Sequence, residues 1–238
     1  MGRVISLWSG PRNRSTALMY SVAQRADVQV VDEPLFGHYL ALSGAARPSR
    51  EEVLAVQATD PQALLPGLQA RLGVDVFLKH MACHLRGWAQ DVFAEHVHVL
   101  LVREPAAVVA SYRKGVERPT LEDLGYAWQA WWWGECQRRG WPVHVLDSDR
   151  LVVDPEAGLR ALCRACGWAW EPAMMGWEPG PRVEDGVWAK YWYAGVHAST
   201  GWAHGASLPA APALTPAEEA LVAECRPHHD VLKAHAMN

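Results

Sequence analysis

The sequence has no long apolar run and very few lysines and phenylalanines. None of its 238 residues falls in an uninterrupted apolar stretch of about 18 residues, the length needed to cross a membrane, so we expect no membrane span. Only 4 lysines stand beside 18 arginines and 3 Phe beside 13 Trp, and the net charge is −4. Because this balance gives no electrostatic support to the binding of polyanions, we expect no nucleic-acid partner.

Cysteines and targeting signals are equally sparse. The 5 cysteines are odd in number and scattered, which is typical of free thiols in a reducing compartment and not of a disulfide framework. The first residues carry none of the charged, apolar and small-residue regions of a signal peptide. The sequence therefore predicts a cytoplasmic protein.

Half of the residues are hydrophobic, and many of them gather in short runs rich in Val, Ile and Leu. These runs do not alternate with polar residues, as in strands that are buried on both faces. The five runs are residues 4–8, 28–31, 74–78, 97–102 and 143–146. The stretches with helical periodicity between them are residues 15–25, 50–71, 88–96, 105–114 and 121–139. This alternation predicts an α/β fold in which a mostly parallel five-stranded sheet lies between helices.

We expect a single domain over residues 1–238, with the α/β core in residues 1–167. Thr215 and Pro216 are typical of the N-cap and first turn of a last helix over residues 215–236. Residues 168–214 form an irregular segment that is either a lid, a wall of an acceptor site or a layer closing the edge of the sheet. Its notable side chains are Trp188, Tyr191, Trp192, Tyr193, His197, Ser199, Thr200 and Trp202.

The loop after the first predicted strand has the chemistry of an oxyanion site. Residues 11–16 read Pro-Arg-Asn-Arg-Ser-Thr and lead directly into a helix. A helix N-terminus presents backbone N–H groups and partial positive charge, and Arg12 and Arg14 add cations. The Gly-Lys pair of a Walker A loop is absent. The alternative is that Ser15 and Thr16 merely cap the helix while the arginines face solvent.

Polar residues also follow the other predicted strands. Glu33 after the second strand and His80 at the end of the third are candidates for a general base, although each is also typical of an ordinary loop residue. After the fourth strand, Arg103 is followed by a helix-starting Pro105 and, eight residues on, by Ser111. An arginine and a hydroxyl in this arrangement suit a second anion, unless the serine simply faces solvent.

Taken together, these motifs resemble those of the sulfotransferase family, whose members have a P-loop fold and use 3′-phosphoadenosine 5′-phosphosulfate (PAPS). Residues 11–16 are similar to the family's loop that grips the 5′-phosphosulfate, although Arg14 replaces its glycine. Arg103-Glu104-Pro105 with Ser111 is similar to the motif that grips the 3′-phosphate. Glu33-Pro-Leu is similar to a segment of carbohydrate sulfotransferases, in which a glutamate serves as base.

The resemblance implies a function and a set of site residues. The chain would transfer a sulfuryl group from PAPS to a hydroxyl of a small-molecule acceptor, with no metal required. The residues that would bind the donor are Arg12, Asn13, Arg14, Ser15, Thr16, Arg103 and Ser111. Arg12 would also stabilise the leaving phosphate, and Glu33, ranked ahead of His80, would act as base. The alternatives are a P-loop nucleotide- or anion-binding protein without turnover and a divergent P-loop kinase.

Two further features carry no predicted chemistry. Cys163 and Cys166 are spaced as a pair, but in a helical run they are better explained as small apolar residues on one helix face. Residues 131–133 are three consecutive tryptophans, which cannot all face one core. We expect one of these rings to be partly exposed, where it would line an acceptor pocket or a subunit contact, so a homodimer is possible.

Overall fold

The computed structural model describes residues 2–70, 73–203, 207–208, 210 and 212–237. Its centre is a sheet of five strands in the order β2-β3-β1-β4-β5, and all neighbouring strands run parallel. The strands are β1 (Val4–Ser9), β2 (Val28–Asp32), β3 (Asp75–Met81), β4 (His96–Val102) and β5 (Val143–Asp147). The predicted parallel sheet is therefore confirmed, and the carboxyl ends of its strands share one edge.

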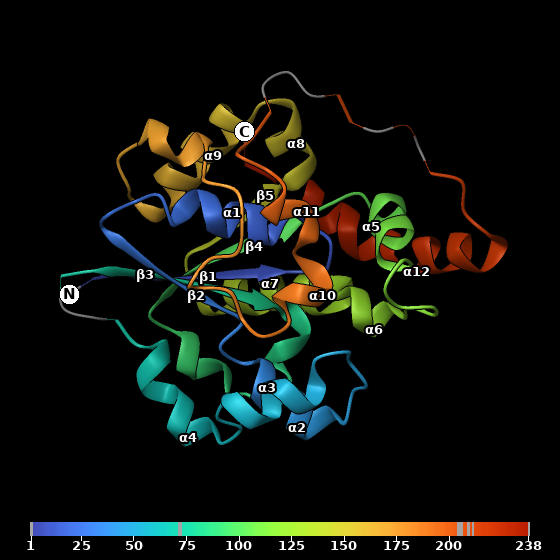
Figure 1. Ribbon diagram of the computed structural model, residues 1–238, viewed down its shortest axis with the longest axis horizontal. Coiled ribbons are helices and arrows are strands. Elements are labelled where there is room, and N and C mark those ends of the chain that lie inside the picture. The colour runs from blue at the N-terminus through green and yellow to red at the C-terminus, as the bar shows by residue number, and fades with distance from the viewer. Residues whose placement is uncertain (1, 71–72, 204–206, 209, 211, 238) are drawn as a thin grey trace.

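Helices cover both faces of the sheet, which gives the three predicted layers (Figure 1). One face packs against α1 (Ser15–Val22), α8 (Ser148–Val153) and α9 (Pro155–Cys166). The other packs against α7 (Tyr126–Arg139) and α12 (Pro216–Lys233). Alternation along β1 explains this arrangement: Ile5 and Leu7 belong to the first core, whereas Val4 and Trp8 belong to the second.

Several predicted helices differ from those observed. Residues 50–71 do not form one helix, because prolines at 61 and 66 start new turns: α3 (Arg50–Val56), α4 (Pro61–Leu64) and the 3₁₀ helix η1 (Leu65–Leu68). Residues 88–96 contain only the 3₁₀ helix η3 (Gln90–Phe93) before β4 begins, so that helix prediction was wrong. The sequence also gave no sign of α2 (Phe36–Ser43) or of the short 3₁₀ helix η2 (Ala82–Leu85).

A left-handed glycine divides the helix predicted over residues 121–139. Gly125 has φ 75° and separates α6 (Leu121–Leu124) from α7. Of the three tryptophans in α7, Trp132 is fully buried while Trp131 is 40% exposed, so the expectation of one exposed ring is confirmed. In α9, Cys163 and Cys166 are buried free thiols in the core.

The irregular segment lies beside α5 (Pro105–Tyr112) and contains three short helices (Figure 1). These helices are η4 (Pro172–Met175), α10 (Ala189–Trp192) and α11 (Ala194–His197). Trp192 stacks on Tyr112 of α5, which brings the segment to the edge where the strands end. Residues 204–206, 209 and 211 of the segment lie outside the described residues.

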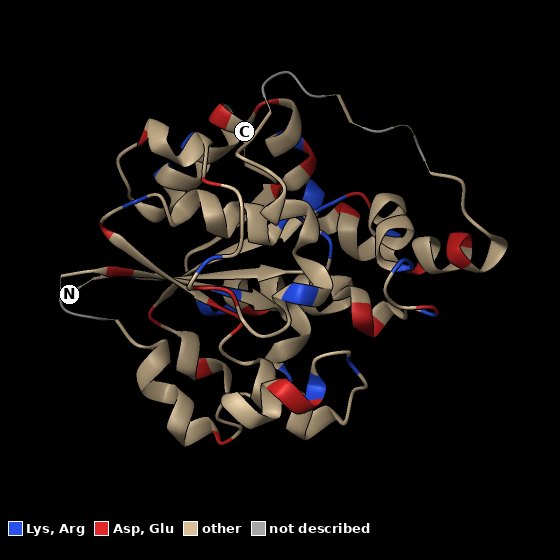
Figure 2. Ribbon diagram, in the orientation of Figure 1, with Lys and Arg blue, Asp and Glu red and all other residues tan. Residues whose placement is uncertain are grey.

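The last helix begins as the sequence predicts. Thr215 and Glu218 form a reciprocal capping box at the start of α12. Over the whole molecule, acidic and basic residues are interspersed along the ribbon (Figure 2). No helix in the described ranges has both the length and the apolar composition to cross a membrane.

Candidate active site

The loop between β1 and α1 bends through two arginines in the left-handed backbone conformation. Arg12 has φ 61°, and Arg14 has φ 66° and ψ 21°. Glu33, directly after β2, has φ 43°, and no other non-glycine residue in the described ranges has a positive φ. This conformation costs an L-residue about 1–2 kcal/mol and persists where the surroundings enforce it. The strain thus gathers at three residues that the sequence assigns to the site.

Helix α1 starts without a side-chain cap. Its N-cap residue is Arg14, and no side chain accepts a hydrogen bond from the first turn. Ser15 and Thr16 stand one and two positions later, inside the helix, so the interpretation of them as simple caps is wrong. The first N–H groups of α1 therefore point toward the loop with no side-chain acceptor, in an arrangement that suits an oxyanion.

The two predicted anion motifs meet in space. Arg12 Nε donates a hydrogen bond of 3.0 Å to Ser111 Oγ on α5. Arg103 Nη1 donates a bond of 2.7 Å to the carbonyl oxygen of Arg12. The segments after β1 and β4 are neighbours because those two strands pair directly. Arg103 and Ser111 of the second motif therefore both lie in contact with Arg12 of the first.

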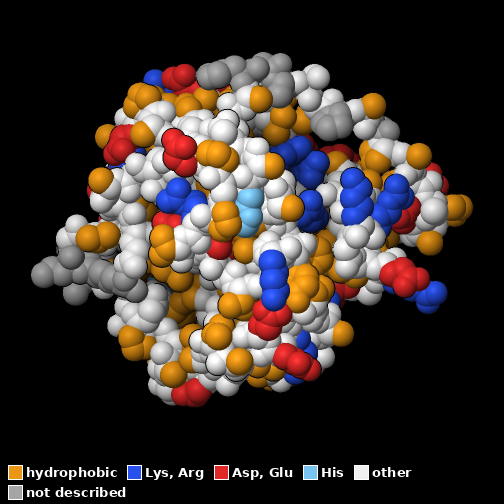
Figure 3. Space-filling model, in the orientation of Figure 1, with side chains coloured by type: hydrophobic (Ala, Val, Ile, Leu, Met, Phe, Trp, Pro, Cys, Tyr) orange, Lys and Arg blue, Asp and Glu red, His pale blue; other side chains and the backbone are white. Residues whose placement is uncertain are grey.

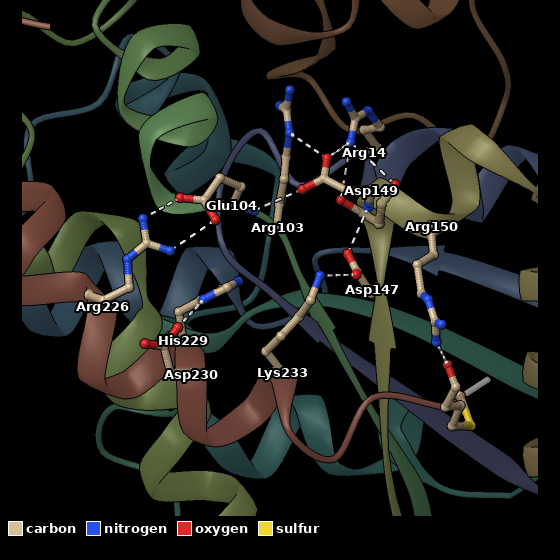
Figure 4. Close-up of polar contacts among 12 residues, drawn as sticks. Arg14, Arg103, Glu104, Asp147, Asp149, Arg150, Arg226, His229, Asp230 and Lys233 are labelled. Atoms are coloured by element: carbon tan, nitrogen blue, oxygen red, sulfur yellow. Dashed lines mark hydrogen bonds and ion pairs between the residues drawn. The ribbon is translucent and has the colours of Figure 1, made fainter. Parts of the chain in front are cut away.

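Arg14 and Arg103 share one carboxylate, that of Asp149 on α8 (Figure 4). Arg14 Nη1 lies 2.9 Å from Asp149 Oδ1, and Arg103 Nε lies 3.6 Å from the same oxygen. Burial, and then the positive charge of Arg14, lower the pKa of Arg103 to about 10. Arg12 lines the same cavity as these two arginines and its carbonyl oxygen contacts Arg103, so this part holds three guanidinium groups, of which two are paired with Asp149. The excess positive charge favours an anion.

Helix α12 supports this cluster from outside (Figure 4). Arg226 forms two contacts with the carboxylate of Glu104, one of them 2.9 Å long, and Lys233 pairs with Asp147. The backbone N–H of Glu104 donates a bond of 3.0 Å to Asp149 Oδ2. Asp147 is the N-cap residue of α8, the helix that carries Asp149. Asp149 is thus held directly by the backbone of Glu104 and by Asp147, and α12 in turn holds the side chains of Glu104 and Asp147.

Glu33 belongs to a buried network around Lys79. Lys79, 1% exposed, places Nζ 2.5 Å from Glu33 Oε1, 2.8 Å from Asp32 Oδ1 and 2.7 Å from the Tyr193 hydroxyl. The Tyr193 hydroxyl in turn donates a bond of 2.7 Å to Asp32 Oδ2. Two carboxylates and one ammonium are thus held together at the ends of β2 and β3.

Burial of Glu33 in this network raises its pKa. Burial is the largest cause, and the nearby Asp32 carboxylate acts in the same direction against the opposing charge of Lys79, so the pKa rises to about 7. One ammonium cannot fully balance two buried carboxylates. Asp32 has more hydrogen-bond donors around it, namely Lys79, the Tyr193 hydroxyl and the backbone N–H of Gly186. Glu33 is the group whose proton is poised to exchange near neutral pH.

Two of the predicted side chains are not brought to the site. His80 is fully buried, stacks on Trp8 at 4.2 Å and does not line the cavity. Burial holds its pKa well below the ordinary value, and its position removes it as the alternative base. Asn13 is also fully buried and donates a bond of 2.9 Å to the Leu101 carbonyl, so its side chain anchors the loop to β4.

The other predicted residues line one cavity of about 510 Å³ at the carboxyl edge of the sheet. They are Arg12, Arg14, Ser15, Thr16, Glu33, Arg103 and Ser111. Aromatic side chains of the irregular segment form a further wall: Trp177, Trp188, Trp192, Tyr193 and Trp202. Figure 3 shows basic side chains gathered beside α11 and over α5 on the visible face. The cavity therefore has a cationic part and an aromatic part.

Sequence reasoning missed several residues of this cavity. Lys79 lies in β3 and its partner Tyr193 in the irregular segment, more than a hundred residues away, and no sequence pattern linked the two. Asp149 falls in a stretch that follows the last strand, and only the fold brings it to Arg14. His84 and Arg47, both of which line the cavity, follow no strand directly. The described residues contain no group of three or more His, Cys, Asp or Glu arranged to hold a metal ion.

Comparison with known proteins agrees with this fold. The model of the family described as sulfotransferase domain matches residues 3–236. Two proteins of Arabidopsis thaliana, branched-chain-amino-acid aminotransferase-like proteins 1 and 2, are each 34% identical to the chain over 235 residues. The match covers 98% of this chain but 42% of each relative, so the chain spans less than half the length of these relatives.

Solved structures share the fold. The sulfotransferase from Alicyclobacillus acidocaldarius has a TM-score of 0.56 and 14% identity, with 100% of this chain and 98% of that chain covered. The sulfotransferase domain from the Synechococcus PCC 7002 olefin synthase has a TM-score of 0.53 and 16% identity, with 94% of each chain covered. The P-loop type of α/β fold expected from the sequence is thus confirmed.

Proposed function

We propose that this chain, which belongs to the sulfotransferase-domain family, transfers a sulfuryl group from PAPS to a hydroxyl of a small-molecule acceptor. The observation that carries the proposal is the cationic part of the cavity. There, Arg12, Arg14 and Arg103 meet at the uncapped start of α1, and in the described part of the chain Asp149 is the carboxylate paired with Arg14 and Arg103. Such a site suits a ligand with two adjacent anionic groups.

The residues present fit the donor. The loop N–H groups, Arg12, Ser15 and Thr16 would hold the 5′-phosphosulfate, and Arg103 and Ser111 the 3′-phosphate. The hydrogen bond between Arg12 and Ser111 supports adjacent subsites for the two groups. The depressed pKa of Arg103 supports an anionic ligand, because an anion would relieve the repulsion from its neighbouring guanidinium groups.

Glu33 is the base in this proposal. Its carboxylate would accept the proton of the acceptor hydroxyl while that oxygen forms a bond to sulfur and the bond from sulfur to the 5′-phosphate oxygen breaks. Adenosine 3′,5′-bisphosphate leaves, and Arg12 with the loop amides would stabilise the charge that develops on it. Lys79 would act as a positioning residue, since it holds one oxygen of Glu33 and leaves the other for the acceptor.

We also propose that the irregular segment covers the bound substrates. Arg12 Nη1 donates a bond of 3.2 Å to the carbonyl oxygen of Trp192, and Tyr193 joins the Lys79 network. Both contacts link residues of α10 and the following turn to the reacting groups. Closure of this segment over the cavity would exclude water, which protects the donor from hydrolysis and strengthens the electrostatic contacts.

The test is transfer of a radiolabelled sulfuryl group from PAPS to a panel of hydroxylated small molecules. We expect labelled product without added ATP, and a loss of about 10²–10³ in rate for Arg12→Ala. Arg138→Ala, which removes a surface arginine of α7, serves as the charge-matched control. Binding of adenosine 3′,5′-bisphosphate without transfer to any acceptor would indicate a binding protein, and magnesium-dependent phosphoryl transfer from ATP would indicate a kinase.

A further inference from the structure

The two parts of the cavity differ in their balance of charge. In the cationic part, Arg14 and Arg103 share Asp149, and Arg12 adds a third guanidinium group. In the aromatic part, the charged groups already have partners: Arg47 Nη2 lies 2.5 Å from Asp123 Oδ1, and Lys79 is held by two carboxylates. The aromatic part therefore has no excess of positive charge with which to attract an anionic acceptor.

The walls of the aromatic part are flat rings in mutual contact. The His84 ring stacks on Phe36 with centroids 4.9 Å apart and planes 11° apart, and it lies 4.9 Å from the Tyr39 ring. Phe36 meets the edge of Trp188 at 5.3 Å. All four residues line the cavity, as does Glu33, and Phe36, Tyr39 and Trp188 belong to the buried cluster of α2 and the irregular segment. Packed rings of this kind form a flat apolar wall against which another planar ring can pack.

His84 presents a neutral polar edge in this wall. It is 2% exposed, its Nδ1 atom has no hydrogen-bond partner, and its ring lines the cavity. Burial, and then the charges of Lys79 and Arg47, hold its pKa well below the ordinary value, so the imidazole is uncharged at neutral pH. The wall can therefore bond to a hydroxyl without attracting a charged group.

From these features we infer that the acceptor is a small, uncharged molecule with an aryl ring. Its hydroxyl is attached either to the ring itself or to a single carbon that the ring carries. This inference rests on the proposed sulfuryl transfer. The ring would lie against the aromatic wall with its hydroxyl at Glu33, which takes the proton as the oxygen–sulfur bond forms and the bond from sulfur to the 5′-phosphate oxygen breaks. The acceptor is small because the donor shares the same cavity of about 510 Å³.

The same features disfavour the other classes of acceptor. A sugar directs hydroxyl groups to all sides, and each must find a polar partner when it is buried. Here Arg47 and Asp123 are paired with each other, and Lys79 is held by Asp32 and Glu33. Among the described residues that line the cavity, a carboxylate-bearing acceptor would find no unpaired cation outside the donor subsites. An aryl hydroxyl needs only apolar contact and one or two hydrogen bonds.

The experiment compares kcat/KM for 4-methylphenol, 4-hydroxybenzoate and N-acetylglucosamine in wild type, Phe36→Leu and Trp131→Leu. We expect 4-methylphenol to exceed each of the others by at least about tenfold, the size of a lost or unpaired buried contact. Phe36→Leu keeps an apolar side chain but removes the flat ring, which should lower kcat/KM for 4-methylphenol roughly five- to tenfold. Trp131, an exposed ring outside the cavity, is the matched control and should change nothing.

Calorimetric binding of adenosine 3′,5′-bisphosphate to each variant separates the two proposals. An unchanged dissociation constant in Phe36→Leu supports a ring that serves the acceptor alone. Preference for the sugar or for the benzoate, or bisphosphate binding with no transfer to 4-methylphenol, overturns the aryl acceptor and leaves the donor site standing. If wild type neither binds the bisphosphate nor transfers to any acceptor, the proposed function itself fails.

Discussion

At the scale of single residues, the site consists of side chains held in costly conformations and environments. Arg12, Arg14 and Glu33 adopt left-handed backbone angles that glycine would occupy without strain. Lys79 is buried with two carboxylates, an arrangement that is stable only while every partner is present. Residues kept in this way serve a purpose other than stability, which is why the strain supports the proposed chemistry.

The residue types of the site could be predicted from the sequence, but the direction of each side chain could not. Lys79 and His80 are adjacent in β3, and consecutive residues of a strand point to opposite faces. Only one of them can meet Glu33, and the packing of His80 on Trp8 decides which. Asn13 turns inward for a similar reason, since it bonds to the neighbouring strand β4.

The first prediction concerns the protonation of Glu33. Because its pKa is raised to about 7, the base is protonated below neutral pH, and kcat/KM should rise as the pH increases through 7 and then level off. Glu33→Gln should lower kcat/KM by about 10²–10⁴ and remove this limb of the pH profile. The measurement is the pH dependence of initial rates at saturating PAPS.

The matched control for Glu33→Gln is Glu51→Gln, which changes an exposed carboxylate on α3. Its pH profile should match that of wild type. Binding of adenosine 3′,5′-bisphosphate should be the same in all three proteins. A Glu33→Gln variant with wild-type rates at every pH would show that another group accepts the proton.

At the scale of elements, the loop between β1 and α1, which carries Arg12 and Arg14, is positioned by the break between α6 and α7. A Cβ atom on Gly10 would stand 2.4 Å from the Leu124 carbonyl oxygen, in the last residue of α6. The chain can turn away there because Gly125 adopts a left-handed conformation. The helical periodicity of residues 121–139 hid this break, since its apolar stripe continues across it. Turns fixed by tertiary contact in this way leave little trace in local sequence.

The second prediction is that Gly10→Ala displaces the loop. Because the clash is with backbone, it cannot be relieved by a rotamer change, and we expect the free energy of unfolding to fall by about 1–3 kcal/mol. Affinity for adenosine 3′,5′-bisphosphate should fall with it, since the loop holds Arg12. Chemical denaturation and calorimetry measure the two effects.

A glycine in a helix provides the matched control. Gly134 lies inside α7, and a Cβ there would meet nothing within 4 Å. Gly134→Ala should therefore raise the free energy of unfolding by about 0.5–1 kcal/mol and leave bisphosphate binding unchanged. Equal behaviour of the two alanine variants would contradict the role given to the contact between Gly10 and α6.

At the scale of the whole molecule, the sequence predicted the sheet but not the contents of its core. Five apolar runs were enough to identify five parallel strands, because strands buried on both faces must be continuously hydrophobic. Three histidines nevertheless lie in the core around Trp8: His80, His96 and His98. Titratable side chains are usually exposed, so nothing in the sequence marked these three as interior residues.

The third prediction follows from these buried histidines. Burial lowers the pKa of His96 to about 4 and of His98 to about 3, and holds that of His80 well below its ordinary value. In the unfolded chain they take up protons below about pH 6.5, whereas in the folded protein they stay neutral. The free energy of unfolding is therefore at its full value above pH 6.5. It declines as the pH falls below that, by up to about 1.4 kcal/mol per pH unit for each histidine.

Denaturation at pH 7, 6 and 5 measures this decline. His80→Leu should reduce the dependence of the free energy of unfolding on pH, because it removes one of the three groups that take up a proton on unfolding. It should break no hydrogen bond, since neither ring nitrogen of His80 has a partner. The partly exposed His228 lies on α12, and His228→Leu is the control that should leave the pH dependence of the free energy of unfolding as it is in wild type. Stability that is constant from pH 7 to pH 5 would contradict neutral histidines in the core.

We propose that the arginines at the ends of β1 and β4 bind a ligand by two phosphate groups. Calorimetry with adenosine 3′,5′-bisphosphate and with AMP tests this binding in wild type, Arg103→Ala and the surface control Arg138→Ala. We expect wild type and the control to bind the bisphosphate at least about tenfold more tightly than AMP, and Arg103→Ala to lose most of this difference. Equal affinity of wild type for the two nucleotides, or an Arg103→Ala variant that discriminates as well as wild type, would contradict it.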